Sequence, residues 1–172
     1  GPEAGKPLAT SPRIQKVAFT GETTTGRLIM QYASENLIPV SMELGGKSPN
    51  IVLRSADLEA AVSAGVRRCI DNSGQSCNAP TRLLVPMEHM DEAIAIAART
   101  ADAITVGAPS DPSTNIGPVV SQLQFDKIQR LIHKGIAEGA ELVAGGPDRP
   151  AHLNAGYYVR PTIFSGVTRT MK

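Results

Sequence analysis

The chain has 172 residues, which is enough for one domain or slightly more with a substantial buried core. Its 17 Lys and Arg residues nearly balance 16 Asp and Glu residues, and a net charge of +1 gives no field that would hold a nucleic acid or an anionic membrane. Three Phe, three Tyr and no Trp provide no base-stacking surface. We therefore expect neither nucleic acid nor membrane as a partner.

The two cysteines, Cys69 and Cys77, cannot form a disulfide framework, and no Cys/His cluster has the spacing of a metal site. We expect no metal and a reducing, cytoplasmic location. The N-terminus has no charged start followed by an apolar core, so no signal peptide is visible. It also lacks an initiator Met, and the chain stops after a strand-like segment, which leads us to expect an internal piece of a longer protein.

The predicted elements alternate between short strands and amphipathic helices. In chain order we expect a strand at 14–20, a glycine turn at 21–26, a helix through 28–32, strands at 40–44 and 50–53, a helix at 58–69, a strand at 82–85, helices at 90–101 and 123–136, and strands at 141–144 and 157–164. This alternation indicates an α/β fold with a largely parallel sheet.

Cys77 is the first candidate for chemistry. It lies in the polar stretch 72–78, between a predicted helix and a predicted strand. A thiol in such a loop can be accessible and ionised, and the thiolate is the nucleophilic form. The alternative is an inert loop cysteine. Cys69 falls on the apolar stripe of the helix at 58–69, so we expect it to be structural.

Glu43 is the second candidate. It ends an apolar strand and is followed almost at once by Gly45 and Gly46. A carboxylate that is partly desolvated there is suited to act as a general base. The alternative is a salt bridge at the end of the strand, with Lys47 or an arginine as the partner.

The glycines Gly21 and Gly26 flank a junction between a strand and a helix, where free backbone N–H groups can bind a phosphate. The segment lacks the Lys-Ser/Thr pair of a P-loop and the spacing of a Rossmann fingerprint. An ordinary tight turn is the alternative.

Three motifs in this order resemble those of the NAD(P)-dependent aldehyde dehydrogenases: Phe19-Thr20-Gly21-x-Thr23-x-x-Gly26, Met42-Glu43-Leu44-Gly45-Gly46-Lys47-Ser48-Pro49 and Gly74-Gln75-x-Cys77. The 34 positions from Glu43 to Cys77 match that family's spacing between general base and nucleophile. Later elements also fit, namely Gly117-Pro118, Gln124-Phe125 and Gly156-Tyr157 to Pro161-Thr162. The resemblance therefore covers the whole chain.

The resemblance implies an aldehyde dehydrogenase-like fold. Residues 1–45 would be the last strand-helix-strand of the dinucleotide-binding domain, and residues 46–172 an incomplete catalytic domain. Cys77 would attack an aldehyde to form a thiohemiacetal and then a thioester, with NAD or NADP as hydride acceptor. Glu43 would activate the water that releases the carboxylic acid. The parent protein would be a homo-oligomer, and the 172-residue piece alone would have little activity.

The resemblance also assigns residues to the cofactor. The diphosphate and nicotinamide half would lie beside Gly21, Glu22, Thr23 and Gly26, the nicotinamide near Leu44, and a ribose within reach of Gln124. Glu22 stands where the family usually has Ser, and its negative charge would weaken pyrophosphate binding unless the side chain points away or pairs with a cation. Two other functions stay open: a cysteine-dependent ester hydrolase, and a non-catalytic interaction module in which Glu22 marks a lost cofactor site.

Overall fold

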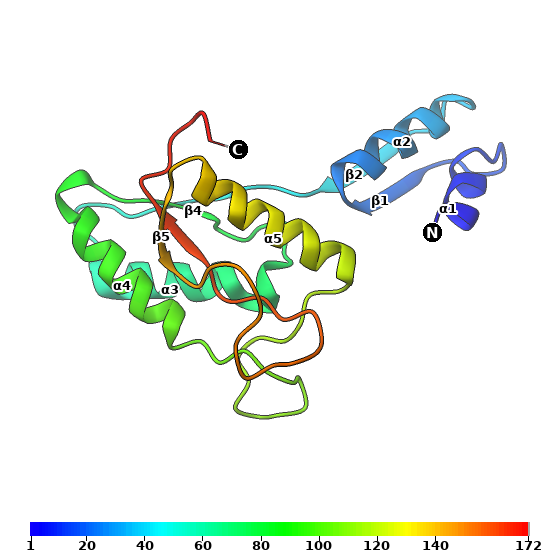
Figure 1. Cartoon of the computed structure of the whole chain (residues 1–172). Coiled ribbons are helices and arrows are strands. Elements are labelled where there is room, and N and C mark those ends of the chain that lie inside the picture. The colour runs from blue at the N-terminus through cyan, green and yellow to red at the C-terminus, as the bar shows by residue number, and fades with distance from the viewer. Residues whose placement is uncertain (172) are drawn as a thin grey trace. The chain divides into compact units, whose positions relative to one another are not determined.

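The computed structural model describes residues 1–171, which form two compact units, Gly1–Gly46 and a second that begins at Lys47. Each unit combines helices with short paired strands (Figure 1). The expected domain limits, 1–45 and 46–172, concern the whole protein and stay a prediction. Within residues 1–171, no helix has both the length and the apolar character needed to cross a bilayer.

The first unit is a strand-helix-strand with a short helix before it. It contains α1 (Pro2–Ala9), β1 (Val17–Gly21), α2 (Thr23–Ser34) and β2 (Val40–Leu44). Strands β1 and β2 pair in parallel, with Val17 opposite Val40 and Gly21 opposite Leu44. Parallel neighbours need a crossover, and α2 provides it.

Helix α2 packs closely on β2 because Gly26 has no side chain. A Cβ at Gly26 would lie 2.8 Å from Leu44 Cδ2. The glycine turn expected at 21–26 is wrong in detail, since Gly21 is the last residue of β1, Glu22 is the N-cap of α2, and Gly26 already lies in its first turns. The start of the helix could not be predicted from apolar periodicity, because residues 23–25 are three polar threonines.

The second unit has its core between two helices and a strand pair. Helices α3 (Leu58–Ile70) and α4 (Met90–Asp102) pack on each other, and β3 (Pro49–Ile51) runs parallel to β4 (Arg82–Leu84). The buried core consists of Val52, Val62, Val66, Ala93, Ile96, Ala97, Ala101 and Ala144. Asp57 caps α3, since its Oδ1 accepts a hydrogen bond of 3.0 Å from the backbone N–H of Ala60.

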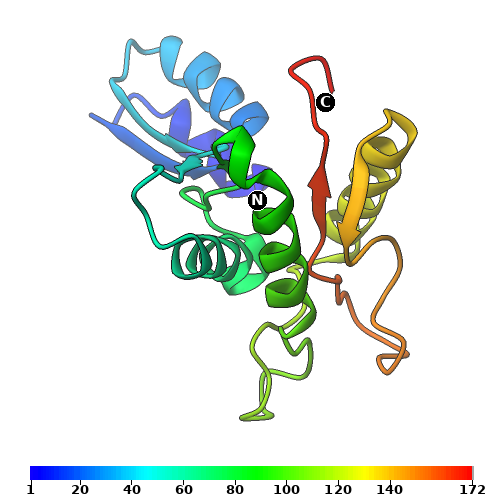
Figure 2. The same cartoon turned by 90° about the vertical axis from the view of Figure 1, so that its left-hand side faces the viewer.

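The last part of the chain adds α5 (Gln122–Ala137), β5 (Glu141–Ala144) and β6 (Ile163–Ser165). The β5–β6 pair is antiparallel, and it lies beside α4 in both views (Figures 1 and 2). The strand expected at 157–164 is therefore shorter than predicted. Two features explain this: Pro161 cannot donate to a ladder, and the carbonyl of Tyr157 accepts a hydrogen bond from Val119 instead.

Of the three strand pairs in residues 1–171, two are parallel, which confirms the α/β fold class. Helix α5 departs from the expectation in its buried face. Phe125 and Ile132 are buried, whereas Leu123, Leu131 and Ile136, whose helical spacing predicted this element, are 76%, 46% and 42% exposed. The helix boundaries follow the predicted period, but only part of the apolar face is covered within this chain.

Candidate active site

Cys77 lies on a tight turn between α3 and β4, and its thiol is exposed. The turn spans residues 76–79 and is closed by a 3.2 Å hydrogen bond from the N–H of Ala79 to the carbonyl of Ser76. Ala79 is itself buried, which fixes the end of the turn in the second unit. The structure thus agrees with the expectation of an accessible loop thiol, while the role of that thiol stays a prediction.

The residues before the turn form a run of left-handed backbone. Asn72, Ser73 and Gly74 have φ angles of 52°, 57° and 72°. Glycine adopts this region freely and asparagine tolerates it, but a non-glycine residue there costs roughly 1–2 kcal/mol. Such a run persists where other contacts hold it.

Asn72 and Gln75 supply the first set of contacts. The backbone N–H and the side-chain Nε2 of Gln75 both donate to the carbonyl of Asn72, each at 3.1 Å. In return, Asn72 Nδ2 donates to the carbonyl of Gln75 at 3.3 Å. These reciprocal bonds close the left-handed run immediately before the cysteine turn.

Two long-range hydrogen bonds attach this loop to the segment 117–120. Ser73 Oγ donates to the carbonyl of Gly117 at 2.7 Å, and Gln75 Oε1 accepts from the N–H of Val120 at 3.0 Å. Sequence reasoning used Gly74-Gln75 only as part of a motif and gave no role to Asn72 or Ser73. The succession of small polar residues was the one available signal, because Asn, Ser and Gly favour such turns.

Cys69 differs from Cys77 in its surroundings. It lies near the end of α3 and is half-buried. Burial raises the pKa of the Cys69 thiol above its ordinary value, and the positive charge of Lys47 offsets part of that effect. Cys69 therefore holds its proton more firmly than an ordinary thiol does, as expected for a structural cysteine.

Glu43 is the penultimate residue of β2, and its side chain is exposed. The partial burial expected for this carboxylate is wrong for the described chain. Met42 and Leu44 are half-buried, and side chains alternate along a strand, so Glu43 lies on the opposite face from Leu44. Because Leu44 contacts α2, the carboxylate lies on the face of the strand pair that α2 leaves open.

The residues proposed for the cofactor divide between the two units. In the first, Gly21 pairs with Leu44 across the strands, and Leu44 contacts Gly26. Thr23 is the first residue of α2, and the N–H groups of this first turn have no acceptor one turn earlier. The structure therefore brings Gly21, Thr23, Gly26 and Leu44 together at the start of one helix.

Glu22 adds a negative charge at the same place. As the N-cap of α2 it lies where the helix dipole favours an anion, and its Oε1 accepts a hydrogen bond of 3.3 Å from Thr24 Oγ1. A bound phosphate would share this helix end with a carboxylate. The expected weakening of pyrophosphate binding stays a prediction.

Gln124 lies in the second unit, in the first turn of α5, and its side chain is half-buried. Its backbone N–H donates to Oγ of the N-cap residue Ser121 at 3.3 Å. Ser121 directly follows Val120, whose N–H is bonded to Gln75. Gln124 and Cys77 are therefore linked through a short series of hydrogen bonds and covalent neighbours.

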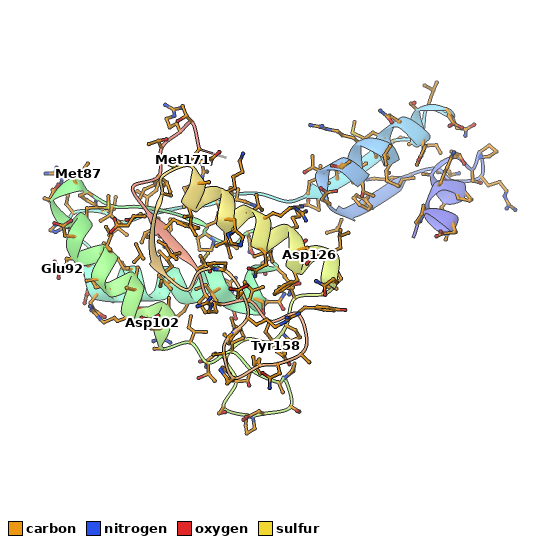
Figure 3. All side chains as sticks on the ribbon, viewed as in Figure 1. Met87, Glu92, Asp102, Asp126, Tyr158 and Met171 are labelled. Atoms are coloured by element: carbon orange, nitrogen blue, oxygen red, sulfur yellow. The ribbon has the colours of Figure 1, made fainter. Side chains whose placement is uncertain are left out.

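A hollow of about 350 Å³ lies elsewhere in the second unit, next to the end of α4. It is lined by residues that include Asp102, which Figure 3 labels, together with His152 and Arg160. None of the predicted site residues lines it. Residues 1–171 contain no cluster of three or more His, Cys, Asp or Glu side chains that could hold a metal ion.

Comparison with known proteins identifies related sequences over the full chain. The family model described as "Aldehyde dehydrogenase family" matches residues 1–172. A 3-succinoylsemialdehyde-pyridine dehydrogenase from a Pseudomonas species is 48% identical over 171 residues, which cover 99% of this chain and 36% of that protein. An EPTC-inducible aldehyde dehydrogenase from Rhodococcus erythropolis is 51% identical, with 96% of this chain and 34% of that protein covered.

A solved structure gives the same result. A mutant of aldehyde dehydrogenase C from Pseudomonas syringae, determined with NAD+ and octanal, matches with a TM-score of 0.98 at 45% identity. The match covers 100% of this chain and 36% of that one. The chain thus spans about a third of the length of the relatives that it matches.

Proposed function

Because the chain belongs to the aldehyde dehydrogenase family, we propose that the protein containing it oxidises an aldehyde to a carboxylic acid with NAD or NADP. The aldehyde dehydrogenase-like fold expected from the sequence is confirmed by the structural match. The Pseudomonas syringae relative was solved with NAD+ and octanal, which supports this class of cofactor and substrate for the present protein.

In the proposed reaction the Cys77 thiolate forms a bond to the carbonyl carbon of the aldehyde, giving a thiohemiacetal. A hydride then leaves that carbon, and a thioester stays on Cys77; the nicotinamide, when bound, accepts this hydride. The backbone N–H of Cys77 donates to the developing oxyanion. Water deprotonated by Glu43 attacks the thioester, which releases the acid and restores the thiolate. The exposed thiol and the exposed carboxylate are both compatible with these roles.

The residues at the start of α2 fit the diphosphate of such a cofactor. The first-turn N–H groups have no acceptor within the helix, and Gly26 lets the start of α2 pack directly on Leu44. We assign Gly21, Glu22, Thr23 and Gly26 to the diphosphate and nicotinamide half, Leu44 to the nicotinamide and Gln124 to a ribose. Glu22 opposes rather than assists the diphosphate.

The observation that carries the proposal is the exposed thiol of Cys77 on a braced turn, inside the Gly-Gln-x-Cys motif of a chain that matches the family from end to end. The test uses the full-length protein that contains these residues. We expect Cys77→Ala to abolish NAD(P)H formation and Cys69→Ala, the matched control, to retain it. Activity that survives Cys77→Ala would refute the assignment.

Glu43→Gln separates the two steps of the reaction. We expect one equivalent of NAD(P)H to form rapidly, followed by slow turnover, because the thioester accumulates when its hydrolysis lacks a base. Loss of the rapid phase itself would contradict the role given to Glu43. The 172-residue chain alone is expected to form little NAD(P)H, since hydride transfer needs thiol and cofactor held together.

The other two functions predict different results. A cysteine-dependent ester hydrolase would turn over activated esters with the same rate with and without NAD(P), and would lose this activity in Cys77→Ala. An interaction module would bind neither NAD nor NADP in calorimetry. We also expect a homo-oligomer in a reducing, cytoplasmic location, to be tested by the solution mass and by fractionation.

A further inference from the structure

The loop that carries Cys77 is attached to a segment far away in the sequence. Ser73 donates to the carbonyl of Gly117, 44 positions later, and Gln75 accepts from the N–H of Val120, 45 positions later. The two loop residues that make these bonds precede Cys77 in the sequence by four and two positions. The loop is therefore braced against one defined strip of backbone.

The strip 117–120 is fixed from its other side as well. The N–H of Val119 donates to the carbonyl of Tyr157 at 2.9 Å, next to the labelled Tyr158 in Figure 3. Val119 is buried. The strip thus lies between the loop that carries Cys77 and the segment around Tyr157. The N–H of Val119 bonds to Tyr157, and the N–H of the next residue, Val120, bonds to Gln75.

The strip leads directly into α5, whose first turns are marked by the labelled Asp126 in Figure 3. Ser121 follows Val120 and caps the helix through its bond with the N–H of Gln124. One route therefore runs from Cys77 through Gln75, Val120 and Ser121 to Gln124. The Gln75 side chain bonds to the residue directly before the cap of α5, and the Ser73–Gly117 bond joins the same two parts of the chain three residues earlier in the strip.

Gln75 is suited to this step because its carboxamide has both a donor and an acceptor. Nε2 donates to the carbonyl of Asn72, which closes the left-handed run, and Oε1 accepts from Val120. A carboxylate would lose the donor, and an apolar side chain would lose both. The same side chain thus fixes the shape of the loop and its place against the strip.

We propose that Gln75, assisted by Ser73, is a positioning residue that holds the Cys77 turn in register with the start of α5. Both polar atoms of the Gln75 carboxamide bond to protein backbone, so it acts through the loop backbone. This inference rests on the proposed function, because register matters for catalysis only if Cys77 is the nucleophile. A displacement of the thiol by about 1 Å is enough to reduce an enzymatic rate by about 100-fold.

The test compares Gln75→Met, which keeps the side-chain length and removes both bonds, with Gln75→Glu, which keeps the acceptor. In the full-length protein, Gln75→Met is expected to lower kcat by about tenfold or more, with KM for aldehyde and for NAD within about twofold. Gln75→Glu is expected to restore part of kcat. Because a loss of folded protein would also lower the apparent kcat at constant KM, kcat is expressed per folded molecule in each variant.

Gln122→Met is the matched control. It makes the same chemical change at the first residue of α5, where Nε2 of Gln122 donates to Asp126 Oδ1 at 2.6 Å. We expect its kcat to stay within twofold of the parent. The inference is overturned if Gln75→Met also stays within twofold, or if Gln122→Met loses as much as Gln75→Met.

Hydrogen exchange followed by mass spectrometry tests the brace without reference to catalysis. In Gln75→Met, peptides covering 71–79 and 117–121 are expected to exchange at least about threefold faster, while peptides from α2 keep their rates. Unchanged exchange at 117–121 would refute the brace. If exchange is faster in Gln75→Met but Cys77→Ala is fully active, the proposed function is refuted. The hydrogen-bonded brace between the loop and the strip then still stands. If Gln75→Met does not fold, Ser73→Ala gives the same two readouts.

Discussion

Ile96 provides a quantitative test of the packing that supports the cysteine loop. Its side chain is 1% exposed, in the core between α3 and α4. Ile96→Val removes one methylene and Ile96→Ala removes three carbon atoms, each worth about 0.8 kcal/mol of transfer free energy. A residual cavity adds to the larger change. We expect the free energy of unfolding to fall by about 1 kcal/mol for Val and about 3–4 kcal/mol for Ala.

Urea unfolding followed by circular dichroism at 222 nm measures both values, provided that the denaturant slope is the same in all variants. Leu123→Ala is the control, because it removes the same three carbons from a side chain that is 76% exposed. Its effect is expected to stay within about 0.5 kcal/mol. If Ile96→Ala costs no more than Leu123→Ala, then Ile96 does not pack as the structure has it.

Three further outcomes follow from single contacts. Asp57→Ala removes the side-chain acceptor at the start of α3 and is expected to lower the free energy of unfolding by about 1 kcal/mol in the same urea experiment. At pH 7.5, iodoacetamide is expected to label Cys77 before Cys69, because Cys77 is exposed and burial raises the pKa of Cys69; peptide mass spectrometry reads the order. Hydrogen bonds from the backbone N–H and the hydroxyl of Ser113 lower the pKa of the Asp111 carboxyl, so its small contribution to stability is present above the ordinary pKa and lost as pH falls through the lowered one. Ser113→Ala removes the hydroxyl donor and should raise the Asp111 pKa in an NMR titration, without restoring it fully to its ordinary value.

Local patterns predicted the helices of the second unit well because their buried faces lie within the chain. Helix α3 begins at Leu58, where the apolar period predicted it, and Val62 and Val66 lie on its buried stripe. Helix α4 follows the same rule with Ala93, Ala97 and Ala101. In both cases the period of 3.6 residues is a property of neighbouring residues, so the sequence suffices.

Pairing partners were less predictable, since they depend on residues far away. The segment 157–164 has the β-branched and aromatic composition of a strand, yet Tyr157 bonds to Val119 and only Ile163–Ser165 pairs with β5. Helix α5 shows the same limit: its apolar periodicity predicted the helix, but Leu123 is 76% exposed among the described residues. Periodicity indicates which face is apolar, not what lies against it.

The candidate site has features that neighbouring residues predict and features that depend on residues far away in the sequence. The motif that contains Cys77 could be recognised by resemblance, and its exposure follows from the polar residues around it. The conformation of the loop could not be predicted, because two non-glycine residues in a row, Asn72 and Ser73, adopt left-handed backbone that local preference disfavours. What stabilises them is a set of hydrogen bonds to Gly117 and Val120, 44 and 45 positions away from their partners in the loop. The left-handed run brings Ser73 and Gln75 to Gly117 and Val120, and these bonds, together with those between Asn72 and Gln75, hold the run.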